Sequence, residues 1–277
     1  NETLKKRGQW PWDRNSLSNE IIKLYQAGAA LVVLPILFAD EDRFGQDEVL
    51  ARTLKQTPTI IGQMPINEAD NSGVIRGVSE IGNSWKGWVY QYPGAIGPIP
   101  LLAENANAVG MMIVAPEADG VVRRMPLVIA IGDKLYPSIS MEILRMAAGD
   151  ISYQMKTGIA GVEKLRIPKF KMIDTDAHGN IWLDFKWKTP TYAMHEKLPD
   201  LTEKIVIVSI TASGLDNPVS TPVGVIHSHD LIGASLATMM TGRNITRPYW
   251  TNVAELGVSF GFALALMVIV LLLPWYF

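Results

Sequence analysis

Two histidines and a carboxylate stand together in the segment His227-Ser228-His229-Asp230. Residues 227 and 229 share one face of an extended segment, and paired imidazoles beside a carboxylate are suited to binding zinc or relaying a proton. The sequence offers no third ligand nearby and no glycine pattern of a nucleophile elbow. We therefore favour a structural cluster in which Asp230 caps a helix, and we predict neither a catalytic residue nor a metal site here.

A run of carboxylates follows the first apolar segment of the chain, at Asp40, Glu41, Asp42 and Asp47. Oxygen ligands gathered on one loop suit calcium or magnesium. The alternative, which we favour over a cation site, is a solvated acidic turn in which Asp47 caps the following helix. Asp40, Asp42 and Asp47 nevertheless remain candidates for contact with a ligand.

The segment from Asp174 to Gly179 resembles the first half of a calcium-binding loop, with oxygen-bearing side chains at its first and third positions and glycine at its sixth. The closing glutamate is missing, because the twelfth position is Phe185. Without the bidentate contact of that glutamate, we predict a plain hairpin over residues 173–185.

Arg123 and Arg124 follow a turn at Asp119-Gly120. Two guanidinium groups side by side are suited to binding an anion, and the alternative is a solvated strand edge. The chain has no phosphate-binding loop, no dinucleotide glycine fingerprint and no Ser-His-Asp or Cys-His signature. We therefore predict no cofactor and expect this chain not to be an enzyme.

The composition is that of a globular domain joined to a membrane segment, with 19% charged and 48% hydrophobic residues. The formal net charge is -2, and no stripe of Lys and Arg is available to replace the counterions of phosphates. Nucleic acid is therefore not expected as a partner. The absence of cysteine excludes disulfides and thiolate metal sites.

The candidate residues depend on a predicted α/β framework. Continuous apolar segments at residues 30–34 and 59–62 are typical of strands buried on both faces of a parallel sheet. A helix predicted at residues 47–54 lies between them, so the three form a βαβ unit. A further helix, capped by Ser16 or Ser18, precedes this unit.

The remainder of the chain alternates between antiparallel strands and helices. Predicted strands lie at residues 108–115, 121–125 and 127–131, a helix at 138–148, the strongest parallel-type strand at 204–210, and a last helix at 231–240. Residues 65–87 and 92–100 are expected to be irregular loops. The predicted fold is α/β, a mixed sheet with parallel core strands flanked by helices and antiparallel hairpins, followed by a C-terminal transmembrane helix.

The last strand adds two candidate residues, Ser209 and Asp216. Ser209 stands at the carboxyl end of the strand, and Asp216 follows in the next turn. The carboxyl ends of parallel strands are where α/β folds place ligands.

The C-terminal run from Leu256 to Leu273 carries no charge, and its one polar side chain is Ser259. At about 1.5 Å per residue, this run approaches the ~30 Å of a bilayer's hydrocarbon core. Two pairs of aromatic residues flank the run, as in the interfacial belts of membrane helices: Tyr249, Trp250, Trp275 and Tyr276. A transmembrane helix is predicted, and the alternative is a buried core helix of a soluble protein.

Four segments, in this order, resemble the type-2 CHASE domains, which are extracytoplasmic sensor modules of bacterial membrane receptors. They are the opening Trp10-Pro11-Trp12-Asp13-Arg14, the first strand with its acidic turn through Asp47, the segment 119–124, and the last strand followed by Asp216, Thr221-Pro222 and Gly224. The resemblance covers nearly all of residues 9–248. The chain departs from the family at Pro35, where an acidic residue is common, and at Ser209, where glycine is usual.

The resemblance implies a sensor domain at residues 1–248 outside the bacterial cytoplasmic membrane, and a transmembrane helix at residues 249–277. It also implies a second membrane helix upstream and an intracellular output such as an adenylate or guanylate cyclase, a histidine kinase, a diguanylate cyclase or a Ser/Thr kinase. The expected partners are the lipid bilayer, a second copy of the chain or other membrane proteins, and an unknown small ligand or protein signal.

Two other functions remain open. One is a structural subunit of a membrane assembly that uses this domain as a docking surface, with residues 92–100, Trp85 and Trp88 covered by the partner. The other is an envelope hydrolase built on His227 and His229. A pocket lined by the strand ends favours sensing, a large protein interface favours assembly, and zinc at the histidines favours chemistry.

Overall fold

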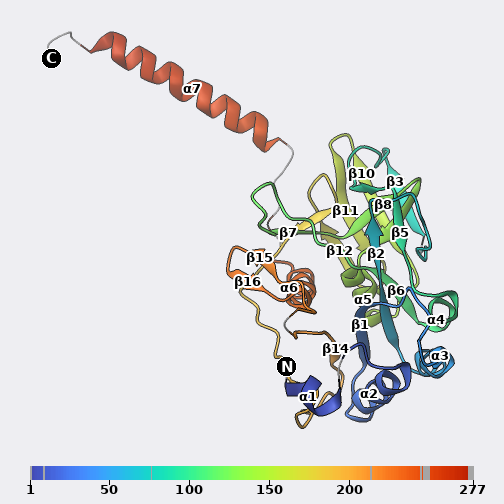
Figure 1. The fold of residues 1–277 in the computed structure, drawn as a ribbon. Coiled ribbons are helices and arrows are strands. Elements are labelled where there is room, and N and C mark those ends of the chain that lie inside the picture. Colours follow the sequence, from blue (N-terminus) through green and yellow to red (C-terminus); the bar gives the residue numbers. More distant parts are fainter. Residues whose placement is uncertain are drawn as a thin grey trace. The chain divides into compact units, whose positions relative to one another are not determined.

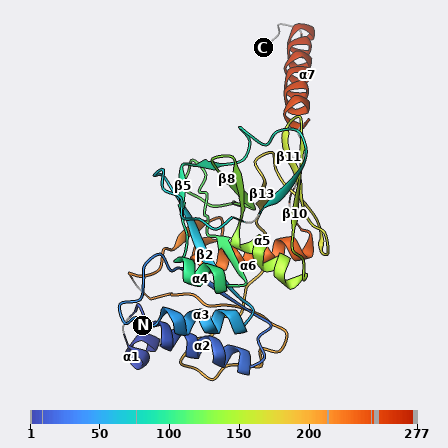
Figure 2. The same cartoon turned by 90° about the vertical axis from the view of Figure 1, so that its right-hand side faces the viewer.

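The structure is a computed structural model of the 277-residue chain, and it describes residues 2–8, 10–75, 77–212, 214–243, 245 and 250–273. It divides into two compact units, residues 1–245 and residues 246–277. Figures 1 and 2 show the elements of both.

A parallel sheet forms the centre of the first unit. Its strands are β14 (Ile205–Ile207), β1 (Leu31–Leu37), β2 (Thr59–Ile66) and β6 (Ala108–Met111), side by side in that order. The C-terminal end of β2, residues 64–66, pairs with the antiparallel strand β5 (Gly94–Ile96). Strand β14 is an edge strand, because it pairs only with β1 among the described strands.

Helices cover both faces of this sheet, as Figures 1 and 2 show. Val32 of β1 and Ile61 of β2 face one hydrophobic cluster, which is built with the helices α2 (Arg14–Gln26), α3 (Asp47–Gln56) and α4 (Pro100–Asn105). Val33 and Ile60 face the other cluster, built with α5 (Ile139–Ala147) and α6 (Ser228–Thr241). Adjacent residues of each strand thus enter opposite cores, which explains the unbroken apolar runs in the sequence.

The rest of the unit is built from short sheets. Strands β10 (Tyr153–Gly158), β11 (Gly161–Ile167) and β12 (Lys171–Asp174) form an antiparallel meander, and β3 (Val78–Gly82) joins β10 in parallel. The other short pairings involve β4 (Gln91–Tyr92) with β8 (Val128–Ile131), β8 with β9 (Lys134–Pro137), β7 (Arg124–Pro126) with β13 (Asn180–Trp182), and β15 (Val219–Thr221) with β16 (Gly224–Ile226). The short helix α1 (Glu2–Arg7) lies at the N-terminal end.

Several expectations are confirmed. The βαβ unit exists as β1, α3 and β2, with the two strands parallel. Helix α5 begins after Ser138, whose hydroxyl accepts a hydrogen bond from the backbone N–H of Met141. The fold is the predicted α/β class with a mixed sheet, and a long apolar helix follows it.

Three local predictions were wrong. The hairpin at residues 173–185 does not form, because β12 pairs with β11 while β13 pairs with β7. Helix α2 is capped by Asp13, whose carboxylate accepts hydrogen bonds from the backbone and hydroxyl of Ser16, so neither Ser16 nor Ser18 is the cap. Strand β3 lies inside the region that was predicted to be irregular. The prediction failed because β3 is formed by pairing with β10, a tertiary contact that the local sequence does not indicate.

The second unit contains the helix α7 (Thr251–Leu272). Its mean hydropathy reaches 2.3 over an 18-residue window, and none of that window is buried. By length and composition this helix can cross a membrane. Trp250 is exposed at its N-terminal end, while the other predicted belt residues, Tyr249, Trp275 and Tyr276, lie outside the described residues.

Candidate ligand-binding site

The sheet has a topological switch point between β14 and β1. From β1 the chain proceeds through β2 to β6 in one direction, whereas β14 lies on the other side of β1. In open parallel sheets such a point leaves a crevice beside the carboxyl ends of the two strands, and ligands bind there.

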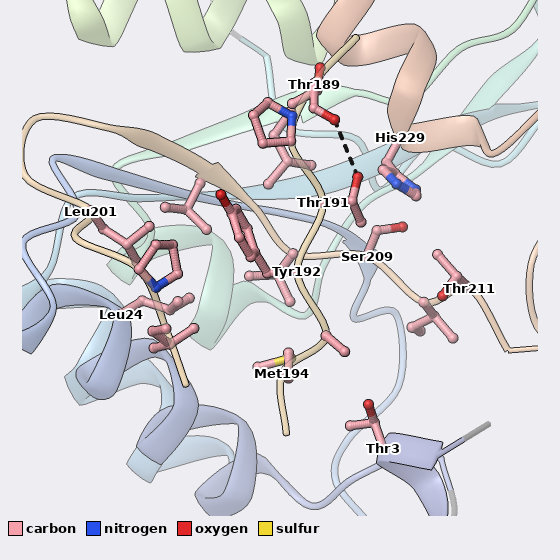
Figure 3. Close-up of a pocket in the computed structure, with 18 of the residues that line it drawn as sticks. Thr3, Leu24, Thr189, Thr191, Tyr192, Met194, Leu201, Ser209, Thr211 and His229 are labelled. Carbon is pink, nitrogen blue, oxygen red and sulfur yellow. Dashed lines mark hydrogen bonds between the residues drawn. The ribbon is translucent and has the colours of Figure 1, made fainter. Parts of the chain in front are cut away.

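A cavity of about 470 Å³ lies beside β14 and reaches this point (Figure 3). Its walls are residues 204–212, which include all of β14, together with residues 189–194 and 198–201 of the preceding connection. Ile36 of β1 also lines it. The volume is within the range of about 300–1,000 Å³ that is typical of small-molecule sites.

The cavity wall is mostly apolar and carries a few polar groups. Leu17 and Leu24 of α2 and the rings of Trp10 and Trp12 supply apolar surface, and the centroids of the two indole rings are 5.7 Å apart. The labelled polar side chains around the cavity in Figure 3 include Thr191, Ser209, Thr211 and His229. Such a wall suits a ligand with an apolar body and a few hydrogen-bonding groups.

One residue of the histidine cluster, His229, lines this cavity. His227 precedes α6, and its Nδ1 is hydrogen-bonded to the carboxylate of Asp216. The rings of His227 and His229 stack with centroids 5.4 Å apart and an interplanar angle of 13°. The structure thus joins Asp216 to the cavity through two imidazoles, and of these only His229 lines the wall.

His229 is partly buried, with 11% of its side chain exposed. Its Nε2 lies 3.7 Å from the carboxylate of Asp230, beyond hydrogen-bonding distance, and its Nδ1 has no partner among the described residues. Burial lowers the pKa of His229 from its ordinary value near 6.5, and this outweighs the opposing effects of Asp230 and Asp216. Burial therefore favours the neutral form of this imidazole.

The proposed capping role of Asp230 was wrong. Residue 227 occupies the cap position of α6, and its side chain makes no capping hydrogen bond. Asp230 lies in the first turn, where a carboxylate interacts favourably with the helix dipole. No group of three or more metal-ligating side chains suited to hold a metal occurs among the residues that the structure describes.

The acidic turn is a separate place, and none of its residues lines the cavity. Asp47 accepts a hydrogen bond from Arg14 Nε at 2.9 Å and another from the backbone N–H of Asp42 at 2.7 Å. The carboxylate of Asp42 in turn accepts from the backbone N–H of Gln46, and Arg14 also donates to the backbone carbonyl of Asp40. These bonds fasten the loop to the start of α2.

Helix α3 begins at Asp47, after Gln46 at the cap position. The carboxylate of Asp47 is only 12% exposed and is directed back to Asp42 and Arg14. It stabilises the loop before the helix rather than the first turn within it. The guanidinium of Arg14 also lies 4.7 Å from the ring centre of the buried Phe38.

The paired arginines are likewise neutralised by neighbours. Arg123 is bonded to Glu117 at 3.0 Å and to Asp119 at 2.7 Å, and Arg124 is bonded to Glu117 at 3.0 Å and to Asp176 at 2.9 Å. The hydrogen bonds from Arg123 lower the pKa of Asp119 to about 2. Since each guanidinium is paired with carboxylates, an anion would have to displace them.

In the segment 174–179, which resembles the first half of a calcium-binding loop, the carboxylate of Asp176 is bonded within the protein. Asp176 accepts hydrogen bonds from the backbone N–H groups of His178 and Asn180, and its other oxygen pairs with Arg124. The carboxylate thus fastens a turn between β12 and β13.

The model of the CHASE2 domain family matches residues 1–272. The chain belongs to the CHASE2 domain family. No curated protein and no solved structure matches it. CHASE2 domains are extracytoplasmic sensor modules, which supports a sensing role for this CHASE2 domain and an extracytoplasmic position for it.

Sequence reasoning located part of this cavity. Ser209 lines it, and Asp216 reaches it through His227 and His229, whereas Asp40, Asp42 and Asp47 lie elsewhere. The connection at residues 189–194 was missed, because it carries no motif and its place on the cavity wall comes from the tertiary fold. The opening Trp10 and Trp12 were recognised as part of the family pattern, but their place on the cavity wall needed the structure.

Proposed function

We propose that this chain is the sensor of a membrane-anchored bacterial receptor, and that its signal binds in the cavity beside β14. The binding event is passed through the membrane helix to an intracellular effector. The observation that carries the proposal is the position of the cavity, which lies beside β14 and reaches the switch point of the sheet of a CHASE2 domain.

The covalent order of the elements supports transmission. His229 at the cavity wall is in the first turn of α6, and α6 ends at Thr241. The next helix along the chain is α7, which begins at Thr251. A ligand that binds one arrangement of the cavity more tightly than another shifts the population of arrangements, and α6 is the element that connects this shift to the membrane helix.

The receptor acts as a homodimer in this proposal. Gly257 and Gly261 are one helical turn apart on α7, and a Cβ atom at either position would have open space around it. Small residues at this spacing let two membrane helices approach closely. Two copies can then change their relative arrangement and regulate an effector that works as a pair.

A docking role in an assembly receives less support. Trp85 is 3% exposed and belongs to the core of this chain, so it is not available to a partner. Part of the segment at residues 92–100 forms β5, which pairs with β2. Trp85 and part of the segment 92–100, which had suggested a surface covered by a partner, therefore stabilise the fold of this chain.

A chimera tests the proposal. The chain, with its own membrane helix, is joined to the catalytic domain of a cyclase that is active only as a dimer, and cyclic nucleotide is measured in cells grown in different media. Ser209→Trp fills the cavity, and Lys156→Ala on the exposed side of β10 is the control. We expect the outputs of wild type and control to change with the medium, while Ser209→Trp stays at one level. A Ser209→Trp output that follows the wild type in every medium refutes the proposal.

A further inference from the structure

The outer edge of β14 has no neighbouring strand among the residues that the structure describes. Leu31, Val32 and Val33 of β1 pair in register with residues 205, 206 and 207, and the backbone N–H of Val208 donates to the carbonyl of Val33. In a parallel ladder, alternate residues direct their N–H and C=O groups to the same neighbour. Val206 and Val208 therefore face β1, and the backbone groups of Ile205, Ile207 and Ser209 point the other way.

These outward groups make no hydrogen bond to any residue that the structure describes. Backbone N–H and C=O groups are paired in nearly all buried settings, and an unpaired row along a strand edge is a template for another extended chain. Native sheets usually protect such an edge with charges, proline or a covering helix. Here the residues on the edge are Ile205, Ile207 and Ser209, none of which is charged.

The cavity lies along this edge rather than over one face of the sheet. Leu17 and Leu24, which line it, belong to α2 and pack on one face. His229, which also lines it, belongs to α6, and α6 packs on the opposite face. A space bounded from both faces and by consecutive residues of β14 occupies the position that the next strand of the sheet would take.

We propose that the signal is a short extended peptide segment that adds to β14 as a further strand. This inference rests on the proposed function, because it names the class of ligand for the same cavity. The N–H and C=O groups of the peptide backbone complement those of Ile205 and Ile207, and this pairing supplies affinity independent of peptide sequence. The stretch from Ile205 to Ser209 spans about 13 Å at ~3.3 Å per residue, which suits a peptide of about four to six residues.

The walls indicate which side chains such a peptide carries. Side chains of a strand alternate between two faces, so successive residues would meet the α2 side and the α6 side in turn. The α2 side offers leucine and tryptophan surface and suits apolar side chains. The α6 side offers the imidazole ring of His229, which suits a hydroxyl or amide group.

Among the described residues, the lining side chains with a formal charge are Asp200 and Lys204, at the amino end of β14. Asp200 already accepts hydrogen bonds from the backbone and the hydroxyl of Thr202. The chemistry therefore favours an uncharged, amphipathic peptide over an acidic or basic one.

Proline substitution separates backbone pairing from side-chain contact. Ile207→Pro removes an outward N–H and obstructs the edge, but it keeps the hydrogen bonds to β1, which residues 206 and 208 make; proline is tolerated at such edge positions. Ile207→Val is the matched control, since it changes the side chain and keeps the N–H. Circular dichroism and thermal melting establish that both variants fold.

A phage-displayed library of random hexapeptides is selected on the full chain in lipid nanodiscs, with empty nanodiscs as the counter-selection. The enriched peptides are synthesised, and their dissociation constants are measured by titration. We expect Ile207→Pro to bind at least about tenfold more weakly than wild type, and Ile207→Val to stay within about threefold. We also expect the amides of residues 205 and 207 to become protected from hydrogen exchange when the peptide binds.

Failure to enrich any peptide, or equal binding to wild type and Ile207→Pro, overturns the peptide inference. The chimera distinguishes this failure from failure of the sensing proposal. If no peptide binds but Ser209→Trp still fixes the output, the cavity senses a ligand of another class. If peptides bind the edge of β14 but neither peptide nor Ser209→Trp alters the output, the sensing proposal fails, and with it the assignment of the peptide as a signal.

Discussion

The acidic turn and the edge of β14 both carry polar groups beside the same parallel sheet, but they differ in how those groups are satisfied. In the turn, the carboxylates of Asp42 and Asp47 and the guanidinium of Arg14 bond to one another or to the backbone. Along β14, the outward backbone groups of Ile205, Ile207 and Ser209 have no partner among the described residues. Satisfied groups stabilise the fold, whereas unsatisfied groups facing a cavity are available to a ligand.

The largest expected effect on stability is at the turn. Arg14→Ala leaves the nearly buried Asp47 without its ion-pair partner and removes the contact with Phe38. We expect the free energy of unfolding to fall by about 2 kcal/mol, since an uncompensated, partly buried charge remains. Chemical denaturation measures it. The control is Arg43→Ala, an exposed arginine of the same turn, for which we expect a change within ~0.5 kcal/mol.

Equal losses in the two variants would contradict the structural role given to the turn. The dissociation constant of the peptide, measured on the Arg14→Ala variant, further tests whether the turn and the cavity are separate. Since no residue of the turn lines the cavity, we expect the dissociation constant to stay unchanged under conditions where the variant is folded.

A smaller effect concerns pH and His229. Burial lowers the pKa of this imidazole in the folded state, so the unfolded chain binds more protons as the pH falls through about 6.5. Stability from this group is complete above that pH and decreases below it. The charged or titratable groups facing the ring are His227, Asp216 and Asp230.

The His229→Gln variant tests this sign. We expect its free energy of unfolding to decline less steeply than that of wild type between pH 7 and pH 5. Denaturation curves at several pH values provide the comparison. An unchanged slope would mean that His229 is not the group that titrates, and a steeper slope would mean that its pKa is raised in the folded state.

The fold was predictable where a local pattern coincides with a tertiary role. The apolar run at β1 and the helix at α3 led directly to the βαβ unit, because strands buried on both faces need hydrophobic residues throughout. The pairing of β3 with β10 and the separation of β12 from β13 were not predictable, because these strands are matched by contacts between distant parts of the chain.

The candidate site was predictable to a similar extent. Ser209 was found from the rule that ligands bind at the carboxyl ends of parallel strands. That rule also pointed to the acidic turn after β1, but the arrangement around Arg14 satisfies those carboxylates within the loop. Sequence identifies which side chains are polar, while the structure identifies which of them lack a partner.

Amide hydrogen exchange along β14 tests the central claim most directly. It is measured residue by residue, by NMR, on the full chain in a lipid nanodisc without added peptide. We expect alternation: the amides of residues 206 and 208, bonded to β1, exchange slowly, while those of 205 and 207 exchange at least about tenfold faster. Equal protection of all four amides would show that another part of the chain already covers this edge, and would contradict an open site for a ligand strand.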